Sequence, residues 1–135
     1  MGTRSLTRIM DDGKEICCIY RQFDGYPSGH GAALAAILAG TQIVNGMSGD
    51  YSKIHNGMGC LAASVIAKLK DGPGGIYLYA PGSKDCGEEY TYTITGAVGG
   101  EPQIAVDDEG YDANDKALGP WQGSASEALA RWVEK

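Results

Sequence analysis

The segment YRQFDGYPSGHG, residues 20–31, gathers polar side chains, three glycines and a proline directly before an alanine-rich run. A glycine-rich turn of this kind can present the first amide groups of a helix, which lack internal hydrogen-bond partners, to an anion. Arg21 and His30 would add further donors to such a site. The alternative is a structural turn in which Asp24 caps the backbone, the glycines serve conformation and His30 lies at the surface.

A second segment, HNGMG at residues 55–59, repeats the order of a histidine, glycines and a helix start. If the two loops meet in space, they favour a shared phosphate or carboxylate site more strongly than either does alone. Asn-Gly is also a common turn dipeptide, so the second loop has a structural alternative. The predicted ligand-binding residues are Tyr20, Arg21, Asp24, Gly25, Tyr26, Gly29, His30, Gly31, Asn45, His55, Asn56 and Gly57.

Evidence for catalysis or metal binding is weaker. No H-x-H, H-E-x-x-H or D-x-D spacing accompanies the two histidines, so we predict neither a metal nor a cofactor. Asp24 and His30 are the residue types that general acid–base catalysis uses, which keeps a small hydrolase or phosphodiesterase as an alternative. No nucleophile elbow or Walker loop supports that alternative, and we assign no catalytic residue.

The composition indicates one globular domain, residues 1–135, with 43% hydrophobic and 21% charged residues. Glycine is the outlier with 21 residues, which indicates many tight turns. The net charge of −6 and the absence of a basic run argue against a nucleic-acid footprint. No apolar run approaches the roughly 20 residues that cross a bilayer, so we expect no membrane partner and a cytoplasmic location.

The four cysteines, Cys17, Cys18, Cys60 and Cys86, include no C-x-x-C pair. Cys17 and Cys18 are adjacent in a predicted strand, so their side chains should point to opposite faces. We interpret all four as reduced thiols, because cytoplasmic proteins rarely hold disulfides. Cys60 lies near a predicted helix start, which favours a thiolate, but it adjoins the apolar residue Leu61 and we expect it to pack in the core.

Hydrophobic periodicity and turn signals divide the chain into alternating elements. Strands are predicted at 3–10 and 14–22 around the turn DDG, at 75–80 and 88–98 around a nine-residue turn, at 102–108, and at the sheet edge at 41–46 and 116–123. Helices are predicted at 32–40, at 58–70, and at 124–135, where Ser124 and Glu127 form a capping box. The fold class is therefore α+β, a two-layer domain with a mostly antiparallel sheet of five to six strands and two to three helices on one face.

The motifs IYRQFDGYPSGHG, IVNG, NGMGCLAA and DCGEEYTYTI span roughly residues 16–96. In these motifs the chain resembles an uncharacterised family of short bacteriophage and bacterial proteins. The resemblance transfers no activity and no catalytic residue. It suggests a phage anti-defence role, since small phage proteins often blunt host defence and some sequester cyclic-nucleotide or ADP-ribose-type signals. The location would then be the host bacterial cytoplasm.

Three functions follow from these observations. The leading one is a non-enzymatic binding protein for an anionic, nucleotide-like small molecule, with Arg21 as a charge-assisted donor and tyrosines stacking on the base. Tight binding requires about 8 kcal/mol or more, which one helix terminus cannot supply, so we expect a homo-oligomer. The alternatives are the hydrolase that uses His30 and Asp24, and an acidic protein-interaction inhibitor that occupies a basic site on a host enzyme.

Overall fold

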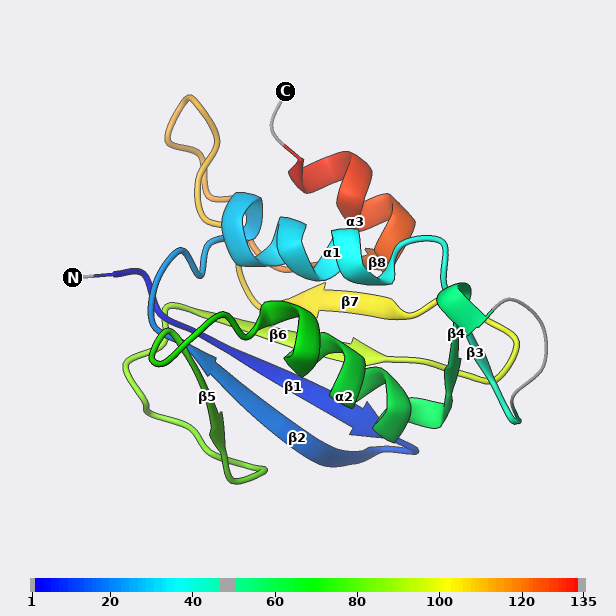
Figure 1. Cartoon of the computed structure of the whole chain (residues 1–135). Coiled ribbons are helices and arrows are strands. Elements are labelled where there is room, and N and C mark those ends of the chain that lie inside the picture. The colour runs from blue at the N-terminus through cyan, green and yellow to red at the C-terminus, as the bar shows by residue number, and fades with distance from the viewer. Residues whose placement is uncertain (1, 47–50, 134–135) are drawn as a thin grey trace.

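The computed structural model describes residues 2–46 and 51–133 and confirms the α+β architecture expected from the sequence. Three α-helices cover one face of a six-stranded sheet (Figure 1). Within the described ranges, no helix combines the length and the apolar character that crossing a membrane requires. The sheet contains β1 (Ser5–Asp11), β2 (Lys14–Arg21), β5 (Ile76–Tyr79), β6 (Tyr90–Thr95), β7 (Gln103–Val106) and β8 (Trp121–Ser124), and the helices are α1 (Ala32–Leu38), α2 (Gly57–Leu69) and α3 (Ala125–Trp132).

The strand order in the sheet is β5-β2-β1-β6-β7-β8. Neighbouring strands are antiparallel except β1 and β6, which run parallel. β1 and β2 form the predicted hairpin, in which Asp12 and Gly13 adopt left-handed φ angles of 52° and 80°. One prediction was wrong: β5 and β6 are not neighbours, because the chain passes from the β5 edge across β2 and β1 before β6 begins.

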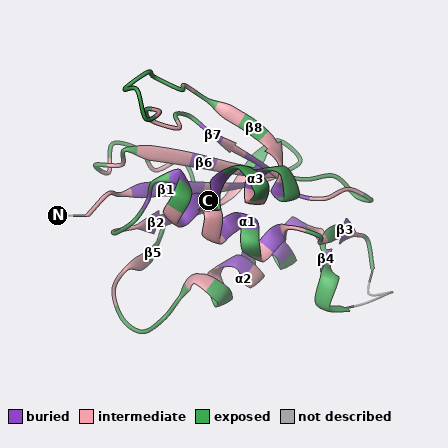
Figure 2. Ribbon diagram, turned by 90° about the horizontal axis from the view of Figure 1, so that it is seen from above, coloured by how far each residue is buried: buried purple, intermediate pink, exposed green. Residues whose placement is uncertain are grey.

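Alternate side chains of each strand face the helices and form the core. In β6, Tyr92 and Ile94 are fully buried, whereas Thr91 and Thr93 on the other face are only partly buried, as the alternation predicted. The register places Tyr92 beside Thr7 of β1, so the buried row continues across the sheet. Figure 2 shows that the helix residues facing the sheet are buried and the outer ones exposed.

The two short strands β3 (Gln42–Val44) and β4 (Ile54–Asn56) form a separate parallel pair. The strand predicted at 41–46 is therefore present, but it lies in this separate pair and not at the edge of the main sheet. A 3-10 turn at Tyr51–Lys53 precedes β4, and residues 47–50, between β3 and this turn, lie outside the described residues.

The helix α3 begins with the predicted capping box. The Glu127 amide donates to Ser124 Oγ (3.1 Å), and the Ser124 amide donates to Glu127 Oε1 (2.8 Å). This cap fixes the start of the helix, so that Trp132 in its last turn reaches the core. There Trp132 packs edge-to-face against Tyr92 and Trp121.

The four cysteines are free thiols. Cys17 packs against the main core and Cys18 lies on the opposite face of the sheet, as their adjacency predicted. The prediction that Cys60 packs in the core is wrong, because its side chain is exposed. Leu61 points into the core, and Cys60 is offset from it by about 100° around the helix.

Candidate functional site

The glycines of the predicted ligand loop leave room for neighbouring groups. Residues Pro27–Gly31 form one π-helical turn ahead of α1. A Cβ atom added at Gly25 would lie 2.8 Å from the Ser5 side chain, and one added at Gly31 would lie 2.8 Å from the Trp132 ring. At Gly29 it would lie 2.5 Å from the Asp24 carbonyl oxygen. Packing, rather than access for an anion, therefore requires glycine at these positions.

The backbone amides of this loop are already engaged. Gly25 donates to the Thr3 carbonyl (2.8 Å), Gly29 to the Tyr26 carbonyl (2.9 Å) and His30 to the Asp24 carbonyl (2.9 Å). A helix start that binds an anion needs unpaired N–H groups. This turn does not provide them at these three residues, which removes the physical basis of the predicted anion cradle.

His30 is fully buried, so it is not the surface residue of the structural alternative, and both of its ring nitrogens have partners inside the protein. Arg21 Nη1 lies 3.2 Å from His30 Nδ1, and because a guanidinium only donates, Nδ1 accepts. The ring proton is then on Nε2, which donates to Thr7 Oγ1 at 2.6 Å. Burial, and secondly the Arg21 charge, lower the pKa of His30 to about 3, so the imidazole is neutral.

The side chains of Asp24 and His30 do not form an acid–base pair. Asp24 has a left-handed φ of 60° and meets His30 only through its backbone carbonyl. Its carboxylate instead accepts a hydrogen bond from the Tyr26 hydroxyl (3.1 Å), and this bond raises the pKa of Tyr26. The geometry therefore offers no support for the hydrolase alternative.

The second predicted loop holds its own residues in a local arrangement. Asn56 Oδ1 accepts a hydrogen bond from the Gly46 amide (2.9 Å), which ties β4 to the end of β3 beside the exposed Asn45. Gly57 adopts a φ of 83° where the chain turns into α2. His55 is buried, and among the described residues neither of its ring nitrogens has a hydrogen-bond partner.

The two histidine-bearing loops do not meet. His30 packs against Tyr92, whose strand begins beside Ser5. His55 pairs with Ile43, whose backbone bonds Gly99 and Gly100 beyond the other end of that strand. Figure 1 shows the start of α1 and the β3–β4 pair at opposite ends of the sheet. The condition for a shared ligand site, that the two loops meet in space, is therefore not fulfilled.

Tyr20 is separated from the other predicted residues by the sheet itself. It lies on the face away from the main core, where it is stacked on Tyr79 at 4.9 Å between ring centroids. Its hydroxyl donates to Gln22 Oε1 (2.7 Å). Of the twelve predicted residues, Tyr26 and Arg21 line cavities, and these cavities are different.

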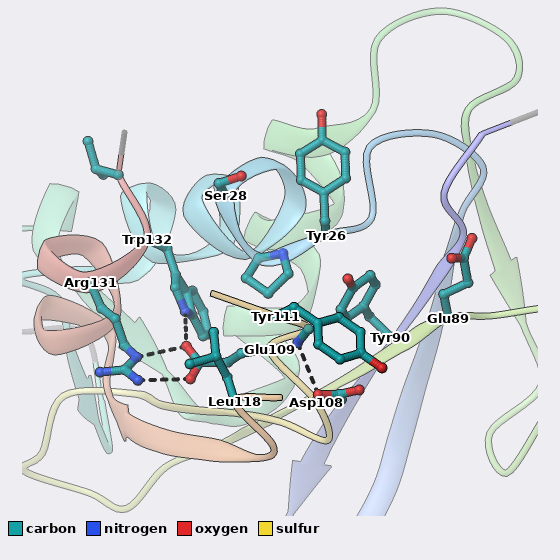
Figure 3. Close-up of a pocket in the computed structure, with 13 residues that line it drawn as sticks. Tyr26, Ser28, Glu89, Tyr90, Asp108, Glu109, Tyr111, Leu118, Arg131 and Trp132 are labelled. Atoms are coloured by element: carbon teal, nitrogen blue, oxygen red, sulfur yellow. Dashed lines mark hydrogen bonds and ion pairs between the residues drawn. The ribbon is translucent and has the colours of Figure 1, made fainter. Parts of the chain in front are cut away.

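The larger cavity, which we call the tyrosine pocket, has a volume of about 690 Å³ (Figure 3). It lies where the turn after β2, the start of β6, the connection from β7 to β8 and the end of α3 come together. Its volume falls within the range typical of small-molecule sites. It is lined by Tyr26, Pro27, Ser28, Glu89, Tyr90, Asp108, Glu109, Gly110, Tyr111, Leu118, Arg131, Trp132 and Val133.

Glu109 is the fixed polar centre of the tyrosine pocket. Arg131 donates to both of its carboxylate oxygens (2.7 and 2.9 Å), and Trp132 Nε1 donates to Oε2 (2.7 Å). Its side chain is only 5% exposed. Burial alone would raise the pKa of Glu109, but the hydrogen bonds from Arg131 and Trp132 outweigh it and the pKa is lowered. Glu109 is therefore ionised and locks the end of α3 to the β7–β8 connection.

The rest of the tyrosine pocket is aromatic and acidic. With Glu109 paired to Arg131, the carboxylates of Glu89 and Asp108 give the lining an excess of negative charge. Burial, and then the neighbouring carboxylates of Asp108, Glu89 and Asp107, raise the pKa of Tyr90. The contribution of these carboxylates reflects negative charge near the Tyr90 hydroxyl. Tyr111 is 70% exposed and leaves its ring available to a ligand.

Of the predicted ligand-binding residues, Tyr26 lines the tyrosine pocket. The other lining residues were not among those predicted, and they come from the same turn and from three further segments around Glu89, Glu109 and Arg131. The one signal in the sequence was the excess of tyrosine, eight residues against one phenylalanine. No group of three or more metal-ligating side chains occurs among the described residues. No protein-family model, curated protein or solved structure matches this chain.

Proposed function

We propose that this protein is a non-enzymatic binding protein whose tyrosine pocket takes a cationic group, an ammonium or a guanidinium, from a partner protein. The observation that carries the proposal is the lining, which combines Tyr26, Tyr90 and Tyr111 with the carboxylates of Glu89 and Asp108. Aromatic faces attract cations, and carboxylates add hydrogen bonds and opposite charge.

The proposal corresponds to the acidic interaction protein among the functions expected from the sequence. The net charge of −6 favours approach of a basic segment. A phage protein that blunts a host enzyme would act in this way. The nucleotide-binding hypothesis remains a prediction, but a phosphate in the tyrosine pocket would face the carboxylates of Glu89 and Asp108, neither of which forms an ion pair among the described residues, and their charge opposes it.

The test uses a matched pair of peptides, acetyl-Gly-Arg-Gly-amide and the same peptide with citrulline, which has the shape of arginine without its charge. We expect the arginine peptide to shift the backbone resonances of Glu89, Tyr90 and Tyr111 in a saturable way, and the citrulline peptide to bind several-fold more weakly. A lysine peptide separates ammonium from guanidinium recognition.

Two variants and one control locate the binding. Tyr111→Ala and Glu89→Gln change exposed residues of the pocket and should each raise the Kd about two- to fivefold. Tyr77→Ala removes an exposed tyrosine from β5, outside the pocket, and should leave the Kd unchanged. Equal binding of the citrulline peptide would refute the proposal. Saturable shifts of the same residues with ADP-ribose would favour the nucleotide hypothesis instead.

A further inference from the structure

A second cavity, of about 170 Å³, lies where the edge strand β5 begins; we call it the Arg21 cavity. Arg21 of β2 lines it, and its apolar lining includes Phe23, Leu69 and Ile76. The volume corresponds to about five or six water molecules, which suits one charged group and one short side chain.

The Arg21 guanidinium is held in place with donors to spare. Nε donates to the Phe23 carbonyl (2.6 Å), and Nη1 donates to Nδ1 of the neutral His30 (3.2 Å). A guanidinium has five N–H groups, so three remain. No carboxylate of the described residues forms an ion pair with Arg21. The side chain is therefore a preoriented cation whose remaining donors suit a carboxylate.

The strand next to this guanidinium has a free edge. The Gln22 amide donates to the Gly75 carbonyl (2.8 Å), which makes these two residues a hydrogen-bonded pair of the β2–β5 ladder. Because such pairs alternate, Tyr77 also bonds to β2, whereas Ile76 and Leu78 direct their backbone groups outward. The Leu78 side chain is 61% exposed, so the edge is accessible.

Part of this edge is already occupied. The Ile76 amide donates to the Gly74 carbonyl (2.8 Å), and the Ile76 carbonyl accepts from Lys70 Nζ (2.8 Å). The next outward-facing residue along the strand is Leu78. An added strand can therefore pair at Leu78, while the ammonium of Lys70 places a second positive charge at the Ile76 end.

We infer that β5 and the Arg21 cavity together bind the carboxyl terminus of a partner polypeptide as an added antiparallel strand. The added strand runs opposite to β5, so two residues after the one that pairs with Leu78 it lies opposite Ile76. That residue is its last if its terminal carboxylate binds Arg21. Its last side chain then lies on the same face of the sheet as Ile76, which is the face of the cavity. Backbone pairing supplies affinity, and the charged terminus sets the register.

Asp71 should oppose the binding of a carboxylate, so its replacement is expected to change the affinity in the direction opposite to replacement of Arg21. It lines the same cavity and carries a negative charge next to the place of the carboxylate. Its repulsion should weaken binding. Asp71→Asn should therefore tighten it, whereas Arg21→Gln should weaken it.

The probe is an acetylated hexapeptide of alternating lysine and valine that ends in a free valine carboxylate, compared with its amidated twin by calorimetry on the full chain. Lysine is chosen because the protein carries a net charge of −6. We expect amidation to weaken binding at least about tenfold, since it removes a charge-assisted contact. Equal affinity of the two peptides, or no binding of either, would overturn the inference.

A proline at the edge tests the strand pairing without disturbing the sheet. In Leu78→Pro the lost N–H is one that points outward, so the ladder to β2 keeps its bonds, and the peptide should bind about three- to tenfold more weakly. Leu78→Ala keeps the N–H and is the matched control. Unchanged binding to Leu78→Pro, or isovalerate alone binding as tightly as the peptide, would exclude strand addition.

Discussion

The buried His30 should make the stability of this protein depend on pH between 5 and 7. Its folded-state pKa is about 3, far below the value of about 6.5 for an unfolded histidine. The folded protein therefore excludes a proton that the unfolded chain binds. Stability from this residue is fully present above pH 6.5 and is lost as the pH falls towards 3.

The magnitude follows from the two pKa values. Protonation of His30 in the unfolded chain lowers the free energy of unfolding by about 2 kcal/mol between pH 7 and pH 5. The total loss is about 5 kcal/mol once the pH is below both pKa values. Carboxylates whose pKa is lowered, such as Glu109, lose their contribution only below about pH 4.5 and do not interfere in this window.

The assay is urea unfolding of the natural protein and of His30→Gln at pH 7, 6 and 5. Glutamine has an acceptor for Arg21 and a donor for Thr7 but no proton to bind in this range. The variant should be less stable at pH 7 by about 1–3 kcal/mol, because a buried site is repacked. Its stability should fall by about 2 kcal/mol less than that of the natural protein on going to pH 5.

His55 belongs in the comparison because burial, and then the charge of Lys68, lower its pKa as well. It is present in both proteins, so the difference between them isolates His30. Nitrogen chemical shifts give a direct check, with His30 in the Nε2–H form at pH 5. An equal loss of stability in the two proteins, or a folded-state titration of His30 near pH 6.5, would refute the assignment of a buried neutral ring.

Further predictions concern glycine packing, the Glu109 ion pair and the cap of α3. Gly31→Ala should lower the free energy of unfolding by about 1–3 kcal/mol, because the new methyl group meets the Trp132 ring. Gly59 in α2 has open space around it, so Gly59→Ala should raise the free energy of unfolding by about 0.5–1 kcal/mol. Urea titration measures both changes. Glu109→Gln should lower stability by about 1–3 kcal/mol at pH 7 and reduce its loss on acidification below pH 4.5, as thermal unfolding at several pH values can show. Ser124→Ala should cost about 1 kcal/mol by loss of the capping box, without changing ligand binding.

The sequence was sufficient where a structure depends on nearby residues. The hairpin around Asp12 and Gly13, the buried face of β6 and the cap at Ser124 each follow from a period, a turn or a spacing of a few residues. The helix layer and the fold class follow from these elements. They were predicted because the local pattern and the final structure agree.

Strand neighbours could not be predicted in the same way. β6 pairs in parallel with β1 across most of the chain, and β3 pairs with β4 outside the main sheet. Both pairings depend on which buried faces fit together in three dimensions. A turn rich in glycine and charge, such as residues 81–89, looks the same in a sequence whether it closes a hairpin or crosses a sheet.

The glycine-rich loop was misinterpreted for a related reason. A glycine that admits a ligand and a glycine that admits a tryptophan have the same sequence signature. Gly31 meets Trp132 and His30 meets Thr7, and neither partner adjoins the loop in the chain. The unusual residues in this segment were a real signal, but Gly31 and His30 make buried packing and polar contacts rather than a shared anion site.

That contact connects the two proposed sites. His30 fixes the Arg21 guanidinium through Nδ1, and the same turn carries Tyr26 into the tyrosine pocket. The segment that suggested a single site is therefore the support of two. It follows that His30→Ala, which removes the contacts to both Arg21 and Thr7, should weaken binding in both cavities, whereas Tyr111→Ala and Leu78→Pro should each affect only one. If His30→Ala leaves both affinities unchanged, the turn has no role in positioning either site.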